Sequence, residues 1–191
     1  MHAIITPGSP QIFAFHGTGG DEHQFAGLAG QLWPGAGIVS PRGTVSEHGA
    51  NRFFRRKAEG IYDMKDLSER TDEMIAFVRR KMAPDIPAFA FGYSNGANIL
   101  AAMTFRAPDL FPRVALLHPL IPFTPPTQPG LAGRRVLITG GLRDPIAPTQ
   151  MTEALAAYYR AQGAELSLAL HGGGHELLPE EIAALRDSFA L

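Results

Sequence analysis

The sequence predicts an α/β fold in which a mostly parallel sheet of about six or seven strands carries helices on both faces. Short apolar runs rich in aromatic and β-branched residues alternate with longer segments of helical periodicity. The 21 glycines and 16 prolines are scattered between these segments, as in the loops of an α/β protein. Because no repeat or linker interrupts the alternation, we expect right-handed crossovers and one domain, residues 1–191.

The first part of the chain opens with a short edge strand at 2–5, which a turn rich in proline ends. Residues 11–15, Gln-Ile-Phe-Ala-Phe, have the length and composition of a buried strand. A glycine-rich loop and a helix at about 22–32 follow, with Asp21 as the expected helix cap. Gly-Ile-Val-Ser at 37–40 predicts the next strand.

The second part repeats the same alternation with longer helices. A helix is expected at 66–82, where apolar residues recur at helical spacing until Pro84 ends it. Residues 121–133 are a proline-rich connection at the surface. The remaining strands are expected at 88–91, 113–117, 135–139 and 165–170, and the remaining helices at about 95–106, 148–162 and 179–190.

The composition excludes several classes of function. The net charge of −1 gives no reason to expect a nucleic acid or a membrane surface as partner. The chain has no cysteine, which excludes disulfides, thiolate metal sites and a cysteine nucleophile. No apolar run approaches the roughly 20 residues of a membrane span, and the first seven residues lack the features of a signal peptide. We therefore expect a cytoplasmic protein.

One stretch carries the strongest chemical signal. Gly92-Tyr93-Ser94-Asn95-Gly96 lies between a predicted strand and a predicted helix, and it fits the G-x-S-x-G pattern of a nucleophile elbow. Glycine is needed on both sides because a side chain there would collide with the strand or the helix. The alternative is a serine in an ordinary glycine-flanked turn, so the motif needs support from the rest of the chain.

That support comes from the ends of the later strands. In parallel sheets, ligands bind beyond the carboxyl ends of the strands. Asp144 and His175 both follow predicted strands, and the chain order Ser94, Asp144, His175 is the order in which an elbow serine meets its acid and its base. Histidine would take the serine proton, and the carboxylate would orient the histidine. Asp144 could instead be only an Asp-Pro turn residue.

An oxyanion hole needs two N–H donors. We expect one from Asn95, directly after the nucleophile, and the other from Thr18 in the loop His16-Gly17-Thr18-Gly19. His16 is expected to pack and hydrogen-bond beneath this loop rather than to transfer protons. His171 and His175 have the spacing of helical metal ligands, but the three glycines between them make a helix and a zinc site improbable.

The segment 43–63 has little periodicity and is expected to be a long irregular loop near the site. It contains Arg52-Phe53-Phe54-Arg55-Arg56. The candidate substrate-binding residues are Arg52 or Arg55 for an anionic or polar group, with Phe53 and Phe54 as an apolar wall. The alternatives are a solvated basic face and two phenylalanines that merely anchor the loop. Glu47 is a candidate partner for the arginines, and His118 is either a pocket wall or a core histidine.

Taken together, these motifs resemble the phospholipase/carboxylesterase family of α/β hydrolases. The likeness is to its small bacterial serine carboxylesterases, a branch similar to the hydroquinone-resistance hydrolases. It covers nearly the whole chain and rests on the motifs at 16–22, 41–43, 52–56, 92–98, 118–120, 144–145 and 174–175. The resemblance implies a serine esterase of the α/β-hydrolase fold with a triad of Ser94, Asp144 and His175, but it implies little about the substrate. This chain departs from larger hydrolases in its reduced N-terminal strands and in having no segment for a lid domain, which argues against long-chain lipids as substrates.

The expected function is therefore hydrolysis of small soluble carboxylic esters through an acyl-enzyme on Ser94. The same three residues are equally suited to thioesters or lactones, and a non-catalytic binding protein on this scaffold is a further alternative. No cofactor and no metal are expected. The expected partner is a small-molecule ester, with no nucleic acid and no membrane, and the family resemblance allows a homodimer.

Overall fold

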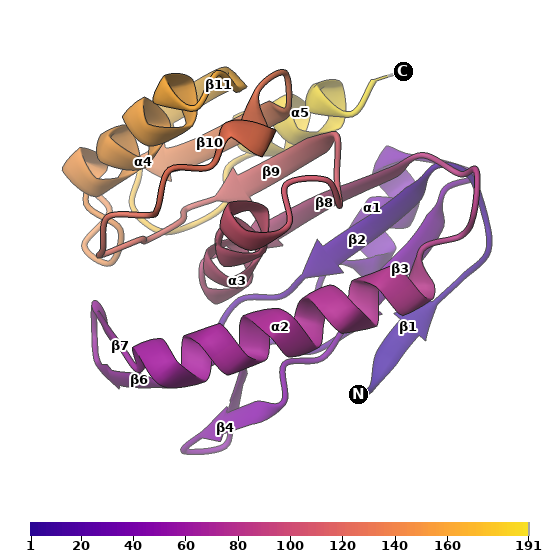
Figure 1. The fold of residues 1–191 in the computed structure, drawn as a ribbon, viewed down its shortest axis with the longest axis horizontal. Helices are drawn as coiled ribbons and strands as arrows, with labels where there is room; N and C mark the ends of the chain where they lie inside the picture. Colours follow the sequence, from indigo (N-terminus) through magenta and orange to yellow (C-terminus); the bar gives the residue numbers. More distant parts are fainter. Residues whose placement is uncertain (191) are drawn as a thin grey trace.

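The computed structural model describes residues 1–190 and is built around one seven-stranded sheet (Figure 1). The strand order is β1-β3-β2-β8-β9-β10-β11. All neighbours pair in parallel except β1, which lies antiparallel to β3 at one edge. The strands are β1 (Ala3–Ile5), β2 (Gln11–Phe15), β3 (Gly37–Pro41), β8 (Ala88–Tyr93), β9 (Arg113–Leu117), β10 (Arg135–Gly141) and β11 (Glu165–His171).

Helices cover both faces of this sheet. One face carries α1 (Ala26–Leu32) and α5 (Pro179–Ser188), and the other carries α2 (Met64–Lys81), α3 (Asn95–Arg106) and α4 (Thr149–Ala161) (Figure 1). Strand β2 shows why its sequence is apolar throughout. Phe13 and Phe15 pack with residues of α2 and α3, whereas Ile12 and Ala14 pack with residues of α1 and α5. The predicted sheet with helices on both faces is confirmed.

Two local predictions are wrong. The first helix begins at Ala26 rather than at residue 22, and Asp21 does not cap it. The Asp21 carboxylate instead accepts the N–H of His23 at 2.9 Å, and this local turn replaces the first helical turn.

The segment 43–63 is also more regular than expected, because it forms two small hairpins. Strands β4 (Val45–Glu47) and β5 (Ala50–Arg52) pair across one two-residue turn, and β6 (Arg56–Ala58) and β7 (Ile61–Tyr62) pair across another. Gly49 and Gly60 lie in these turns at φ of 88° and 68°, where glycine carries no steric cost. We call residues 43–63 the hairpin insert.

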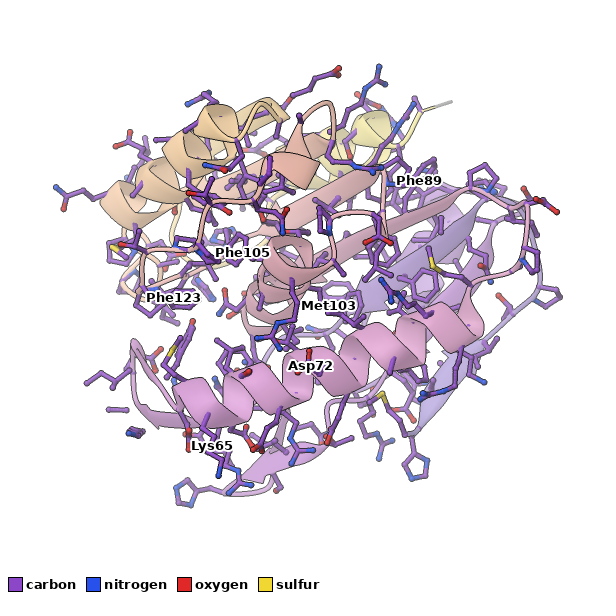
Figure 2. The ribbon with its side chains drawn as sticks, viewed as in Figure 1. Lys65, Asp72, Phe89, Met103, Phe105 and Phe123 are labelled. Carbon is purple, nitrogen blue, oxygen red and sulfur yellow. The ribbon has the colours of Figure 1, made fainter. Side chains whose placement is uncertain are left out.

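The proline-rich connection 121–133 lies against the helices as an extended segment with one short 3₁₀ turn, Pro129–Leu131. Phe123 packs edge to face on Phe105 of α3, with the ring centroids 6.5 Å apart (Figure 2). Within residues 1–190, no helix has both the length and the apolar character required to cross a membrane.

The parallel strands place their carboxyl ends along one edge of the sheet. Loops that leave β2, β8, β9, β10 and β11 at this edge carry Thr18, Ser94, His118, Asp144 and His175. Residues that lie up to 157 positions apart in the sequence are therefore brought to one place by the topology of the sheet.

Candidate active site

Ser94 stands in a strained turn between β8 and α3. Its backbone has φ 51° and ψ −115°, a region that residues with a Cβ rarely adopt. A Cβ on Gly92 would lie 2.4 Å from the carbonyl oxygen of Gly96, and a Cβ on Gly96 would lie 2.3 Å from the carbonyl oxygen of Phe15. The two glycines are therefore required by close backbone contacts, as the motif predicts.

The Ser94 hydroxyl lies at the start of a hydrogen-bonded line of side chains. Its Oγ is 2.9 Å from Nε2 of His175, and Nδ1 of the same ring is 2.6 Å from Oδ2 of Asp144. The carboxylate can only accept, so Nδ1 carries a proton and Nε2 is free to accept the serine proton. The Tyr93 hydroxyl donates to the backbone carbonyl of His175 at 2.6 Å and so fixes the loop that carries the ring.

Asp144 is buried and well supplied with donors. Its Oδ1 accepts the N–H groups of Ile146 at 2.8 Å and Ala147 at 2.9 Å, while Oδ2 faces two histidines. Burial opposes ionisation, but the hydrogen bonds from Ala147, His118 and His175 outweigh it and hold the pKa of Asp144 below its usual range. Asp144 therefore forms the Asp-Pro turn that was the alternative interpretation, and it also contacts His175.

Backbone contacts hold the Asp144 loop against the His175 loop. Leu142 N–H donates to the carbonyl of His171 at 2.8 Å, and Arg143 N–H donates to that of Gly173 at 2.9 Å. A Cβ on Gly141 would lie 2.0 Å from the carbonyl oxygen of Gly174, so the two loops touch at a position that only glycine can occupy. The distance between the acid and the histidine is therefore set by the main chain.

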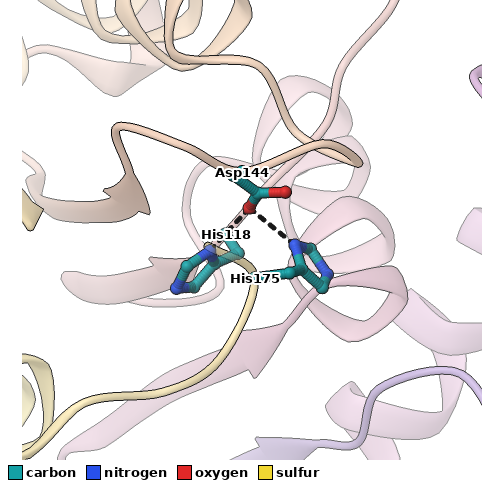
Figure 3. A group of neighbouring side chains, drawn as sticks. All are labelled: His118, Asp144 and His175. Atoms are coloured by element: carbon teal, nitrogen blue, oxygen red, sulfur yellow. Dashed lines mark hydrogen bonds and ion pairs between the residues drawn. The ribbon is translucent and has the colours of Figure 1, made fainter. Parts of the chain in front are cut away.

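His118 lies directly beneath this line. Figure 3 shows Asp144 between the rings of His118 and His175, with Oδ2 bonded to both. His118 is fully buried, and its Nδ1 is 2.8 Å from Asp144 while its Nε2 is 3.0 Å from Oε1 of Glu181. It also forms part of the cavity lining, so His118 is both a core histidine and a part of the pocket wall. Burial lowers the pKa of His118, but the hydrogen bonds to Glu181 and Asp144 outweigh it and raise the pKa overall.

Glu181 is a site residue that the sequence did not indicate. It lies in the first turn of α5, where its Oε2 accepts the N–H of Leu178 at 2.8 Å, and it is only 1% exposed. Its carboxylate also accepts from the Thr139 hydroxyl at 2.6 Å and from Nε2 of His171 at 3.1 Å. A glutamate after Pro179 predicts a helix start, but nothing in that pattern says that it points into the core.

Two groups of side chains in the described residues are dense enough to bind a metal ion: His118, Asp144 and His175, and His118, His171 and Glu181. In the second group, Nδ1 of His171 accepts the N–H of Gly173 at 3.0 Å, so its proton lies on Nε2 and no lone pair faces the others. In the first, Asp144 is already bonded to four donors. Both groups are satisfied as hydrogen-bond networks without a metal ion.

The two expected oxyanion donors both border the cavity. In the loop after β2, the N–H groups of Gly17, Gly19 and Gly20 are taken up by Gln24, Asn51 and Gly17. Within residues 1–190, the N–H groups of Thr18 and Asn95 donate to no protein acceptor. They are therefore available to a ligand oxygen beside Ser94.

His16 lies beneath this loop, as expected. It is buried, its Nδ1 donates to the carbonyl of Gly17 at 2.7 Å, and its Nε2 accepts the N–H of Gly43 at 2.8 Å. These two bonds require the neutral ring, and burial also lowers the pKa of His16. His16 therefore joins the glycine-rich loop to the start of the hairpin insert.

The insert separates the candidate substrate-binding residues. Arg52 is buried and borders the cavity, with Nη1 2.8 Å from Oγ1 of Thr18 and Nε 3.2 Å from a carboxylate oxygen of Glu47. Arg55 has a largely exposed side chain that pairs with Asp66 at 3.2 Å, and it is not part of the cavity lining. The expected pairing of Glu47 with the arginines is present, and Arg56 joins it at 3.0 Å.

Phe53 and Phe54 do not form the wall expected of them. Both are buried away from the cavity, where Phe53 packs on Phe15 and His16 and Phe54 packs on Tyr62. They anchor the hairpin insert, which was the alternative interpretation. Large aromatic side chains gain more by leaving water than by lining a polar pocket.

The cavity beside Ser94 has a volume of about 250 Å³. Its wall is formed by residues of the loops at the strand ends and of the hairpin insert, together with residues at the start of α3. The lining is Thr18, Arg52, Arg56, Glu59, Tyr62, Tyr93, Ser94, Asn95, Asn98, His118, Leu120, Ile146 and His175. Apart from Leu120 and Ile146, every lining side chain carries a polar group, while the larger part of the exposed wall is apolar.

A serine on a strand-to-helix turn, with a histidine and an aspartate from the ends of later strands, is the arrangement of α/β hydrolases. No family model matches the chain. MhqD of Bacillus subtilis, which is named as a hydrolase, is 37% identical over 182 residues, which are 92% of this chain and 90% of MhqD. The chain therefore belongs to the phospholipase/carboxylesterase family of α/β hydrolases and is an ester-cleaving hydrolase.

Solved structures agree with this assignment. The carboxylesterase of Bacillus cereus is 34% identical with a TM-score of 0.91, over 97% of this chain and 91% of that chain. Atu2452 of Agrobacterium tumefaciens is 48% identical with a TM-score of 0.87, over 96% and 91%. YahD, solved with malic acid, is 28% identical with a TM-score of 0.85, over 97% and 96%.

Proposed function

We propose that this protein is a serine carboxylesterase that hydrolyses small polar esters through an acyl-enzyme on Ser94. The observation that carries the proposal is the line Ser94–His175–Asp144, with two unused N–H groups, from Thr18 and Asn95, beside the serine. A serine hydroxyl is a weak nucleophile, and a histidine base held by a carboxylate supplies the activation that it lacks.

In the proposed reaction, Ser94 Oγ attacks the ester carbonyl while its proton passes to Nε2 of His175. The carbonyl oxygen becomes an oxyanion, which accepts hydrogen bonds from the Thr18 and Asn95 N–H groups. The C–O bond to the alcohol then breaks, and the alcohol leaves with the proton from His175. Water then attacks the acyl carbon while its proton passes to His175. The bond to Ser94 Oγ breaks, Ser94 takes the proton back from His175, and the acid leaves.

The size and polarity of the cavity support small polar esters. A volume of about 250 Å³ is below the range of typical drug-sized ligand sites, and Arg52, Arg56, Asn95 and Asn98 border it. That YahD was solved with malic acid, a small polar acid, agrees with this substrate class. The leaving group is less constrained, because the same three side chains can cleave an ester, a thioester or a lactone.

The test is labelling with a fluorophosphonate probe, followed by peptide mass analysis, together with turnover of p-nitrophenyl acetate, an acyl-CoA and an aryl lactone. We expect the label on Ser94 and a loss of ester turnover in Ser94→Ala by roughly 10⁴-fold or more. Ser46→Ala, at an exposed position of β4 in the insert, is the matched control and should behave as the wild type. Unchanged ester turnover in folded Ser94→Ala would exclude the proposed mechanism.

A further inference from the structure

The buried network below the candidate triad contains more charge than a triad needs. Asp144 is shared between His175 at 2.6 Å and His118 at 2.8 Å, and the far side of His118 meets Glu181 at 3.0 Å. All three of the residues Asp144, His118 and Glu181 have side chains that are 0–1% exposed. Water therefore does not screen these contacts, and the protein itself must balance the charges.

The donors and acceptors can be assigned one by one. Glu181 accepts from Thr139, Leu178, His171 and His118, and these four donors satisfy an ionised carboxylate. Asp144 is ionised for the same reason. Nδ1 of His118 then faces Asp144 at 2.8 Å, and its Nε2 faces Glu181 at 3.0 Å and, farther away, Nε2 of His171 at 3.4 Å. Nε2 of His171 carries a proton that Glu181 accepts at 3.1 Å. Because carboxylates only accept, both ring nitrogens of His118 carry protons.

We propose that His118 is an imidazolium between pH 5 and 9, and that it acts as a positioning residue which fixes Asp144 and weakens the hold of Asp144 on the His175 proton. The Asp144 carboxylate divides its negative charge between the two rings. Without the charge on His118, it would stabilise protonated His175 alone. The positive charge of His118 therefore disfavours a second positive charge on the His175 ring. The catalytic meaning of this role rests on the proposed function above.

The other groups around the two rings are the same in the wild type and in the variants used below. His118 is packed by Tyr93 from the end of β8, by His171 from the end of β11 and by His175 from the following loop. Nδ1 of His171 accepts the N–H of Gly173. Burial raises the pKa of Tyr93 to about 12, so the Tyr93 hydroxyl adds no charge near neutral pH. Glu176, on the same loop as His175, accepts the N–H of Gly174 at 3.0 Å. Its negative charge is present in the wild type and in every variant, so it does not affect their comparison.

The size of the effect follows from the geometry. The centroids of the His118 and His175 rings are 5.1 Å apart. Coulomb's law with an effective dielectric constant between 20 and 80 then predicts that a unit charge on His118 moves the midpoint of the His175 titration by roughly 0.5 to 2.5 pH units.

The variant His118→Asn removes the charge with little change to the backbone. His118 has φ 51°, a conformation that asparagine tolerates, and the asparagine amide can still donate to Asp144. His48 in the first hairpin turn has the same φ of 51° and is exposed, so His48→Asn is the matched control. The double variant His118→Asn/Glu181→Gln removes the charges of both His118 and Glu181, so no unpaired glutamate charge remains beside the site.

The experiment is NMR of the ¹⁵N-histidine-labelled wild-type protein and of these variants between pH 5 and 9, with no substrate. We expect two protonated ring nitrogens on His118 at every pH. The His175 midpoint should rise by roughly 0.5 to 2.5 units in His118→Asn, rise less in the double variant and stay unchanged in His48→Asn.

A neutral His118 ring at pH 7 in the wild type would overturn the proposal, and so would an unmoved His175 midpoint in a folded His118→Asn protein. Because neither measurement uses ester turnover, a protein that cleaves no ester but shows both signals would contradict the proposed function alone. A folding failure of the variant would leave the wild-type spectrum to decide.

Discussion

Two regions of the molecule reach the same cavity by different means. Ser94, Asp144 and His175 come from the carboxyl ends of strands, and we call them the strand-end rim. The hairpin insert reaches the cavity with Arg52, Arg56, Glu59 and Tyr62, which lie on two small ribbons outside the main sheet. The loops of the rim are joined by main-chain hydrogen bonds. The insert shares one main-chain bond with the glycine-rich loop, from Gly19 to Asn51, and is otherwise held largely by side chains.

The contacts that hold the insert show this difference. The Asn95 side-chain oxygen accepts the N–H of Phe53 at 2.7 Å, and Asp66 accepts that of Arg55 at 2.7 Å. Asn95 therefore has a second role through its side chain, which the sequence did not indicate. A region held largely by side chains can change its shape by substitution without disturbing the sheet. The proposed function therefore assigns the chemistry to the rim, and we expect the insert to influence substrate choice.

The largest expected effect comes from the rim. Asp144→Asn would leave the shape of the side chain but would favour the wrong tautomer of His175, with no proton acceptor toward Ser94. We expect kcat/KM for p-nitrophenyl acetate to fall by roughly 10⁴-fold with an unchanged far-UV spectrum. Asp187→Asn, at an exposed aspartate, is the control and should keep full activity. A loss of less than tenfold in Asp144→Asn would show that the rim does not work as a triad.

The second effect tests the close contacts beneath the rim. A Cβ on Gly96 would lie 2.3 Å from the carbonyl oxygen of Phe15 and 2.5 Å from that of His16, and main-chain atoms cannot move aside cheaply. We expect Gly96→Ala to lower the free energy of unfolding by about 3 kcal/mol, measured with urea. Gly30→Ala, where nothing lies within 4 Å of the new Cβ, should instead gain about 0.5–1 kcal/mol.

The same difference between the regions explains what could be predicted from the sequence. The strand ends follow local rules, so the elbow and the positions of Asp144 and His175 at the edge of the sheet could be read from short motifs. Glu181 could not, because its burial depends on how α5 packs against β9 and β10. The hairpins of the insert were missed although Gly49 and Gly60 mark their turns, since three-residue strands carry almost no periodicity.

A smaller effect is expected when the insert is changed. Arg52→Lys keeps the charge, but lysine cannot bond to Thr18, Glu47 and the carbonyl of Phe54 at once. The Thr18 loop would lose one support, and we expect kcat/KM to fall by roughly tenfold. Arg55→Lys is the matched control, and it should stay within about twofold because that side chain pairs at the surface. Equal losses in the two variants would contradict the assignment of Arg52 to the cavity.

The smallest effect concerns an ion pair between residues that flank the glycine-rich loop and the hairpin insert. Arg42, directly before the insert, binds both carboxylate oxygens of Glu22, which follows the glycine-rich loop. This hydrogen bond lowers the pKa of Glu22 to about 2. We expect Glu22→Gln to lower the Tm at pH 7 by a few degrees at most, because partly exposed pairs are screened by water and salt. Glu165→Gln, which breaks the exposed pair with Arg135, is the control and should change the Tm less.

The pH dependence gives the sharper form of this last prediction. The pKa of Glu22 is lower in the folded state than the ordinary value of 4.5, so the contribution of its charge to stability is complete above about pH 4.5. That contribution is lost as the pH falls from 4.5 toward 2, where the folded protein also takes up the proton. The difference in Tm between wild type and Glu22→Gln should therefore be constant from pH 5 to 7 and shrink below pH 4.5. A difference that stays constant down to pH 2.5 would mean that the loss in Glu22→Gln comes from packing and not from the charge that links the glycine-rich loop to the hairpin insert.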